Sequence, residues 1–208
     1  MGRHTEAKCR LCRREGTKLF LKGSRCFSAK CAVVRRESAP GMHTFRRSKP
    51  SQYCIQLREK QKVKRYYGMR EKSFRHLFHK AEQMPGNTGE ALLTMLERRL
   101  DNVLYLSGFA LGRSHARQLA THGHFEVNGR RVNVPSYLVQ ADDVITVHGS
   151  DQYKAAIKAN REETKDREVP AWLAVSEDPP TVTVRVLPGR DEISVEVREH
   201  MVVEILSK

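Results

Sequence analysis

Apolar residues recur at helical spacing through the middle of the chain. One stripe predicts a helix that begins near Glu71 and ends before Pro85, with apolar positions Phe74, Leu77, Phe78 and Ala81. A longer stripe predicts a single scaffold helix, capped by Thr88 and ended by Gly108, with apolar positions Leu92, Leu93, Leu96, Leu100, Val103 and Leu104. Ahead of both, Ser51 predicts the cap of a helix that runs toward Tyr67, with Cys54, Leu57 and Gln61 on one face.

Alternating residues predict strands in the second half. A short helix from about Arg113 to His122 leads into a hairpin whose turn is Asn128-Gly129. A strand at 144–147 is expected to join that hairpin in a small mixed sheet. A second hairpin is predicted from alternation at Val182, Val184 and Val186 and again at Ile193, Val195 and Val197. Its strands are expected to fold back onto the first part of the chain, and Trp172 is expected to be a packing anchor.

These elements predict an α+β fold with four segments. Residues 1–50 form a basic arm of little periodicity, and residues 51–96 form the helical part of a first domain. Residues 97–160 form a compact inserted domain of helices and a small sheet, and residues 161–208 return to the first domain. No apolar run approaches the length of a membrane span.

Charge is divided unevenly between the two parts of the chain. The net charge is +14, but residues 1–86 carry 23 Lys and Arg against 6 Asp and Glu, whereas residues 87–208 carry 15 against 18. This asymmetry predicts that the first part binds a polyanion and that the remainder has other duties. The acidic C-terminal end is expected to make protein contacts, with ordinary solvation as the alternative. An acidic membrane surface is the weaker alternative, because the basic segment lacks the apolar face of an interfacial helix.

Four cysteines of the arm have the spacing of metal ligands. Cys9, Cys12, Cys26 and Cys31 follow the pattern C-x2-C-x13-C-x4-C, which predicts one structural zinc ion in a tetrahedral site. An iron-sulfur cluster, a redox sensor and four unrelated buried thiols remain alternatives. Disulfides are disfavoured, since no secretory signal is visible and Cys54 leaves an odd number.

The motifs of the inserted domain resemble the S-four RNA-binding domain. They are Arg99-Leu100-Asp101-Asn102-Val103, Gly112-Arg113-Ser114-His115-Ala116-Arg117-Gln118-Leu119, His122-Gly123-His124 and Val127-Asn128-Gly129-Arg130-Arg131-Val132. Together with Leu21-Lys22-Gly23, Lys30-Cys31-Ala32 and Leu57-Arg58-Glu59-Lys60-Gln61-Lys62, the whole chain resembles the bacterial-type small-subunit ribosomal protein S-four family, in its four-cysteine form.

The resemblance implies a structural constituent of the small ribosomal subunit and not an enzyme. Members bind small-subunit ribosomal RNA early, at a junction of helices in the 5′ domain, and nucleate assembly. The implied neighbours are ribosomal proteins S-five and S-three, on the side where messenger RNA enters, and the contact with S-five supports translational accuracy. The implied location is the cytoplasm, within the small subunit, with an organellar ribosome also open. No membrane or small-molecule substrate is expected.

The candidate RNA-binding residues are spread over the arm, the helical part of the first domain and the inserted domain. In the arm they are Arg3, Arg10, Arg13, Arg14, Lys22, Arg25, Lys30, Arg35, Arg36, Arg46, Arg47 and Lys49. In the helical part they are Tyr53, Arg58, Lys60, Lys62, Lys64, Arg65 and Arg70. In the inserted domain they are Arg113, Ser114, Arg117, Gln118, His122, His124, Asn128, Arg130 and Arg131. Arg113 and Ser114 open a helix whose N-terminus suits a phosphate, although incidental surface charge is the alternative, as is a structural role for His122 and His124.

Two departures from the family pattern predict small losses of local stability. Gly112 stands where a serine usually caps the helix, and Asp142 stands where a glycine usually takes a left-handed turn. The alternative functions are a separate S-four-domain RNA-binding protein of the stress type and an accessory of an RNA-modifying enzyme. The flanks are too short for the catalytic domain that such enzymes carry.

Overall fold

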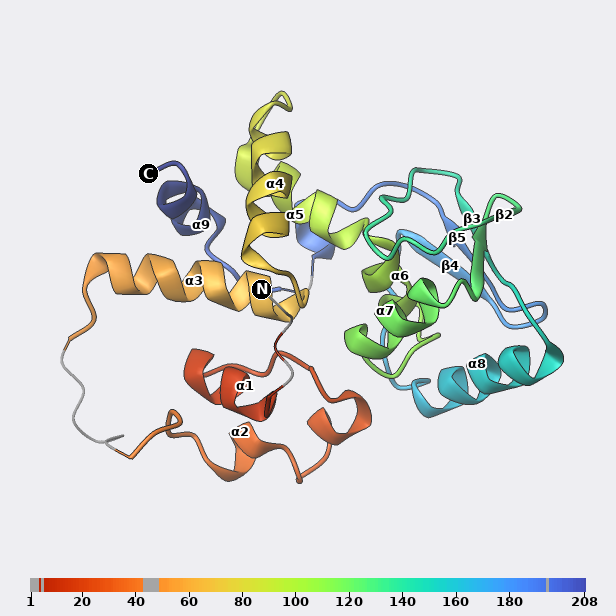
Figure 1. Ribbon diagram of the computed structural model, residues 1–208, viewed down its shortest axis with the longest axis horizontal. Coiled ribbons are helices and arrows are strands. Elements are labelled where there is room, and N and C mark those ends of the chain that lie inside the picture. The colour runs from red at the N-terminus through yellow and green to blue at the C-terminus, as the bar shows by residue number, and fades with distance from the viewer. Residues whose placement is uncertain (1–3, 5, 43–48, 194) are drawn as a thin grey trace. The chain divides into compact units, whose positions relative to one another are not determined.

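A computed structural model describes residues 4, 6–42, 49–193 and 195–208 (Figure 1). The described residues divide into two compact units. The first unit contains Met1–Leu92 and Val195–Lys208, and the second contains Leu93–Ser194. The chain therefore leaves the first unit once and returns to it at its C-terminal end. The second unit is therefore inserted in the sequence of the first.

The first unit is helical within its described residues. Its elements are α1 (Cys9–Glu15), the 3-10 helix η1 (Gly23–Cys26), α2 (Ala32–Arg35), α3 (Gln52–Tyr66), α4 (Glu71–Glu82), the start of α5 (Thr88–Glu97), and α9 (Glu199–Leu206). Helix α3 begins as predicted, because the Ser51 hydroxyl accepts a hydrogen bond of 3.3 Å from the Cys54 N–H. The predicted apolar stripe of α4 is buried along its whole length.

The buried face of α3 differs from the predicted one. Gln56, Lys60, Val63 and Tyr66 are buried, whereas Cys54, Leu57 and Gln61 are only half-buried. Helix α9 packs against α3, as Figure 1 shows, and buries Val202. The side chain of Glu59 on α3 also accepts a hydrogen bond of 3.3 Å from the Arg198 N–H just before α9. The chain end that returns to the first unit is thus a helix and not the predicted hairpin.

The second unit combines helices with one antiparallel sheet. Its elements are the end of α5, α6 (Leu100–Leu106), α7 (Arg113–Thr121), β1 (Phe125–Val127), β2 (Arg130–Arg131), β3 (Val144–Val147), α8 (Asp151–Glu163), β4 (Leu173–Ser176), β5 (Thr181–Val184) and the 3-10 helix η2 (Arg190–Glu192). Among the described residues the sheet has five strands in the order β2-β1-β3-β5-β4. Helices α6 and α7 pack together beside it (Figure 1). Its core includes Phe109, Phe125, Ile145 and Trp172.

The predicted hairpin turn is confirmed. Asn128 and Gly129 both have positive φ angles, 51° and 75°, as the tight turn between β1 and β2 requires. Asp142 also lies in the left-handed region, with φ of 66°, as its departure from the usual glycine predicts.

The single long scaffold helix was a wrong prediction, because the chain leaves helical geometry between α5 and α6. Arg99 has an extended backbone and forms an isolated bridge with Leu138. The Leu100 N–H then donates 2.8 Å to the Tyr137 carbonyl. Backbone partners some forty positions away therefore replace the helical hydrogen bonds that the local pattern favours.

The prediction of a second hairpin was also wrong, both in the strand that pairs with residues 181–184 and in the domain to which these residues belong. Strand β5 pairs with β4 on one side and β3 on the other, with Val182 opposite Val175 and opposite Ile145. All pairings are antiparallel, so the sheet is not mixed. Residues 161–194 belong to the second unit rather than the first, because the inward side chains of β5 complete its core. In the parts of the chain that the structure describes, none of the helices has the length and hydropathy needed to cross a bilayer.

Candidate nucleic-acid interface

The four arm cysteines come together at one place. Cys9 and Cys12 lie on α1, Cys26 ends η1, and Cys31 precedes α2; all four line one small cavity. Cys12, Cys26 and Cys31 are buried. The Cys26 sulfur accepts a hydrogen bond of 3.3 Å from the Lys22 N–H. Sequence spacing therefore located a real cluster.

The thiols influence one another electrostatically. Burial raises the pKa of Cys12 and of Cys26, and the neighbouring cysteines raise both further, while backbone N–H groups oppose this shift. Four sulfur donors in one cavity, with backbone N–H groups directed at two of them, fit the chemistry of a structural thiolate site. In the described ranges, however, no group of three or more His, Cys, Asp or Glu side chains is arranged so that it could hold a metal ion. The zinc site therefore stays a prediction.

The cations of α3 are largely engaged with acidic side chains of their own unit. Glu15, whose side chain is fully buried, accepts hydrogen bonds from Arg58 at 3.3 Å and from Arg65. Glu71 pairs with Lys60 at 2.7 Å and with Lys64 at 2.9 Å. The nearest acid to Lys62 is Glu59, at 2.8 Å.

Lys60 was wrongly predicted as an RNA contact. Lys60 is only 6% exposed, and its ammonium group donates a hydrogen bond to Glu71 on the buried side of α3. The other α3 cations are half-buried, so a bound phosphate would compete with the carboxylates that already neutralise them. Sequence reasoning missed these pairings because Glu15 lies about fifty positions from Arg65.

The arm exposes more of its predicted cations than α3 does. The exposed cations are Arg10, Arg14, Lys22, Arg25, Lys30, Arg35, Arg36 and Lys49. Tyr53 and Arg70, which follow the arm in the sequence, are also exposed. Arg13 instead donates a hydrogen bond of 2.9 Å to the Ser38 carbonyl. Arg3, Arg46 and Arg47 lie outside the described residues. From Gly16 to Arg36 the sequence contains no Asp or Glu, so this stretch presents positive charge without an acidic neighbour in sequence.

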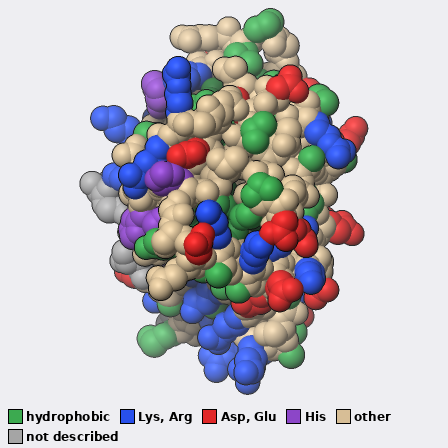
Figure 2. Space-filling model, turned by 90° about the vertical axis from the view of Figure 1, so that its right-hand side faces the viewer, with side chains coloured by type: hydrophobic (Ala, Val, Ile, Leu, Met, Phe, Trp, Pro, Cys, Tyr) green, Lys and Arg blue, Asp and Glu red, His purple; other side chains and the backbone are tan. Residues whose placement is uncertain are grey.

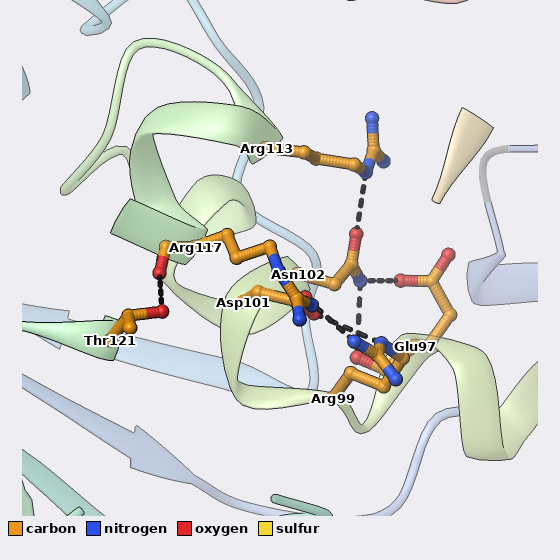
Figure 3. A network of polar contacts seen from close by, with 7 residues as sticks. All are labelled: Glu97, Arg99, Asp101, Asn102, Arg113, Arg117 and Thr121. Atoms are coloured by element: carbon orange, nitrogen blue, oxygen red, sulfur yellow. Dashed lines mark hydrogen bonds and ion pairs between the residues drawn. The ribbon is translucent and has the colours of Figure 1, made fainter. Parts of the chain in front are cut away.

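A buried polar network joins α6 to α7 in the second unit (Figure 3). Arg99 donates to both carboxylate oxygens of Asp101, at 3.0 and 2.7 Å, and Arg117 donates to the same carboxylate at 3.0 Å. Asn102 donates to the Glu97 carbonyl at 3.1 Å and accepts 2.9 Å from Arg113. The motif Arg99-Leu100-Asp101-Asn102 therefore acts inside the domain, where it holds the two helices together.

Arg113 was wrongly predicted to bind a phosphate on the surface. It is 6% exposed, and its guanidinium lies 4.2 Å from the centroid of the Tyr105 ring. Arg113, Ala116 and Ala120 are all buried on one face of α7. The spacing i, i+3, i+7 of these residues is the signal that could have revealed the burial. Arg117 is half-buried: its guanidinium pairs with Asp101 in the network, and part of its side chain remains exposed to solvent.

The exposed face of α7 keeps the other predicted residues. Ser114, Gln118 and His122 are exposed at i, i+4 and i+8. Arg131 reaches this end of the helix, because its guanidinium donates 2.9 Å to the Gly123 carbonyl and 3.3 Å to that of His122. Arg130 is exposed beside it on β2. The structure thus places α7 and the hairpin on one polar surface, as the sequence predicted, while their RNA contacts stay predictions.

His124 belongs to a cluster that the sequence did not reveal. Its ring lies 5.9 Å from that of His122 and 4.0 Å from that of Tyr153 on α8. Burial lowers the pKa of His124, and nearby His122, Arg131 and His148 lower it further, which favours the neutral form of the ring. Figure 2 shows histidines gathered beside Lys and Arg on one side of the face it presents, with Asp and Glu more frequent on the other.

Asn128 contributes less to this surface than predicted. Its side chain donates 2.8 Å to Asp143 and accepts 2.9 Å from the Val144 N–H. Both ends of the amide therefore stabilise the hairpin turn against β3.

Family models match most of the chain in two adjoining blocks. The model described as "Ribosomal protein S4/S9 N-terminal domain" matches residues 3–97, and the model described as "S4 domain" matches residues 98–145. A relative from Pelotomaculum thermopropionicum, described as small ribosomal subunit protein uS4, is 54% identical over 208 residues and covers all of both chains. The chain belongs to the uS4 family.

Other uS4 relatives match equally completely. The Clostridioides difficile uS4 protein is 51% identical over 208 residues, and a Symbiobacterium thermophilum protein described as uS4A is also 51% identical over 208 residues. Both matches cover all of each chain. The junction of the two family models at residues 97 and 98 coincides with the break between α5 and α6. The S4 domain match thus begins at this interruption, five residues after Leu93, where the second unit begins.

Proposed function

We propose that the chain is a structural component of the small ribosomal subunit and binds the RNA of that subunit directly. The observation that carries this proposal is the full-length identity of about half with relatives that are named small ribosomal subunit protein uS4. The S4 domain match and the exposed cations of the arm support RNA as the ligand. The family is one of structural ribosomal proteins, so we propose no catalytic reaction.

The finer parts of the proposal rest on family resemblance. The chain binds at a junction of RNA helices in the 5′ domain and nucleates subunit assembly there. It borders ribosomal proteins S-five and S-three near the path of messenger RNA, and the contact with S-five supports accuracy. The acidic balance of residues 161–208, 11 Asp and Glu against 7 Lys and Arg, suits protein contacts better than phosphate contacts.

A structural zinc ion in the arm is part of the same proposal. Cys9, Cys12, Cys26 and Cys31 would hold it as thiolates, and it would supply the folding energy that a loop-rich arm lacks. The shared cavity and the backbone N–H groups at Cys12 and Cys26 support this assignment. An iron-sulfur cluster is the alternative occupant of the same donors.

The deciding experiment measures the affinity of the full chain for a small-subunit 5′-domain RNA and for a size-matched RNA, over a series of salt concentrations. We expect tight binding to the 5′-domain RNA that survives moderate salt, because specific contacts add to the salt-dependent binding free energy from phosphate contacts. Equal and salt-sensitive binding to both RNAs would leave a general basic RNA binder and would overturn the ribosomal assignment.

A matched pair of variants locates the interface within that experiment. Arg25→Gln removes an exposed arm cation, whereas Arg58→Gln removes one that already faces Glu15. We expect the first to reduce the salt slope by about one, because one phosphate contact is lost, and the second to reduce it less.

A further inference from the structure

Two aromatic rings stack on each other in the arm, and one of them faces solvent. The ring centroids of Phe20 and Phe27 lie 5.0 Å apart, with an angle of 29° between their planes. Phe27 is 58% exposed, which is high for a phenylalanine, whereas Phe20 is half-buried. A single exposed apolar side chain is ordinary on a protein surface, so exposure alone carries no function.

The backbone holds the pair in place. Phe20 has a φ angle of 49°, in the left-handed region that bulky side chains rarely adopt. It follows Leu19, which is 2% exposed and anchors this loop in the first unit. Phe27 directly follows Cys26, and its N–H donates 3.0 Å to the Ser24 carbonyl. The outer ring is therefore presented by a turn next to the cysteine cluster rather than by a loose loop.

The segment that carries the pair has only positive charges, which favours a polyanion as its partner. Six exposed cations lie between Gly16 and Arg36, and this range contains no acidic residue; they are Lys18, Lys22, Arg25, Lys30, Arg35 and Arg36. Cations that attract phosphates together with an exposed aromatic ring form the combination that binds single-stranded nucleic acid. In a folded RNA, the bases available for such stacking are those in loops, bulges and junctions.

We propose that the exposed ring of Phe27, stacked on Phe20, stacks in turn on an unpaired base of the small-subunit RNA, while cations of the same segment contact the adjoining phosphates. This inference rests on the proposed function and deepens it, because it assigns the arm a contact with a base in addition to the phosphate backbone. The sequence alone does not reveal this site, because Phe20 and Phe27 are seven positions apart in a segment without periodicity.

The test compares variants of Phe27 in the full chain, with the same 5′-domain RNA and size-matched RNA as probes. Phe27→Leu keeps an apolar side chain but removes the ring, and Phe27→Trp keeps a stacking surface. Val34→Thr is the matched control, because Val34 is 55% exposed in the same arm and the change keeps its shape. We expect Phe27→Leu to weaken binding to the 5′-domain RNA about tenfold, which corresponds to about 1.4 kcal/mol. Phe27→Trp and Val34→Thr should bind as the wild type does.

The salt slope separates stacking from charge. Phe27→Leu should leave the slope of log K against log salt unchanged, because no phosphate contact is lost, whereas Arg25→Gln should lower it. The Phe27→Trp variant adds a direct readout, since its indole fluorescence should be quenched by the RNA beyond any change of the buried Trp172 in the wild type.

The outcomes distinguish failure of the stacking site from failure of the proposed ribosomal function. If the wild type does not discriminate between the two RNAs, the proposed function fails. If it discriminates but Phe27→Leu binds normally, or if Phe27→Trp loses as much affinity as Phe27→Leu, the stacking site is overturned and the ribosomal function stands. Normal RNA binding by Phe27→Leu combined with a loss of incorporation into reconstituted subunits would assign the ring to a protein neighbour instead.

Discussion

Arg117 donates a hydrogen bond of 3.0 Å from Nη1 to the Oδ2 atom of Asp101, a carboxylate that Arg99 already holds with two hydrogen bonds. Asp101 is buried, at 4% exposed, whereas Arg117 is half-buried on α7. One carboxylate thus pairs with two arginines and fixes the helix whose outer face is predicted to meet RNA. Some of the basic residues of the S4 motif therefore stabilise the interior of the domain and are not available to bind RNA.

Asp101→Asn should destabilise the second unit by about 3 kcal/mol, because it leaves two arginine side chains beside a neutral amide in a buried site. Chemical denaturation of the full chain, followed by a probe of the second unit such as Trp172 fluorescence, measures this loss. Asp142→Asn is the control, since Asp142 is exposed and asparagine tolerates its left-handed backbone. A stability of Asp101→Asn equal to that of the control would contradict the role assigned to the network.

Arg113→Ala and Arg130→Ala should separate folding from binding. Arg113 is buried against Tyr105 and Asn102, so its removal should cost about 2 kcal/mol or more of folding free energy. Arg130 is exposed on β2, so its removal should leave stability within about 0.5 kcal/mol and lower the salt slope of RNA binding by up to about one. Paired denaturation and binding curves check both. A stable Arg113→Ala chain with weakened RNA affinity would restore the surface role that burial argues against.

The ion pairs of Glu71 should make the first unit sensitive to acid. Burial alone would raise the pKa of Glu71, but hydrogen bonds from Lys60 and Lys64 outweigh it and lower this pKa from 4.5 to about 2. The folded-state pKa is lower than the unfolded one, so the pairs stabilise the fold fully above pH 4.5 and progressively less as the pH falls toward 2. The carboxylate is partly exposed, so the effect should be about 1 kcal/mol.

Glu71→Gln tests that expectation, because it removes the titrating group and keeps the shape of the side chain. Denaturation curves between pH 7 and pH 3 should show a smaller acid-dependent loss in the variant than in the wild type. Glu82→Gln is the control, since Glu82 on the same helix faces His79 at the exposed surface. Identical pH profiles for the wild type and Glu71→Gln would show that these pairs contribute nothing to folding.

Metal removal should act on the arm alone. The proposal predicts one zinc ion per chain, and Cys12→Ser should lose it, whereas Cys54→Ser, which changes a cysteine outside the cavity, should keep it. The loss should disorder the arm, since structural zinc supplies on the order of 10 kcal/mol of folding energy. Elemental analysis of the purified chain, with hydrogen exchange of residues 4–42, measures both effects. Iron with sulfide would assign a cluster, and metal-free chains with a protected arm would refute the metal site.

Features encoded in neighbouring residues were predicted from the sequence. The Ser51 cap of α3, the buried stripe of α4 and the Asn128-Gly129 turn depend on contacts within a few positions, so local chemistry is sufficient to specify them. The spacing of the four cysteines and the charge asymmetry are likewise visible in the linear chain, as are the motifs that pointed to the uS4 family.

Features that depend on distant partners were decided by the tertiary structure. The helix break at Arg99 depends on its bridge to Leu138, 39 positions away, and the pairing of Glu15 with Arg58 spans 43 positions. The place of β5 depends on pairing with both β3 and β4. Arginine and lysine look alike in a sequence whether they face RNA or a buried carboxylate. Only the fold shows which charges are already neutralised, because Coulomb interactions depend on distance in space and on burial, and neither can be read from position along the chain.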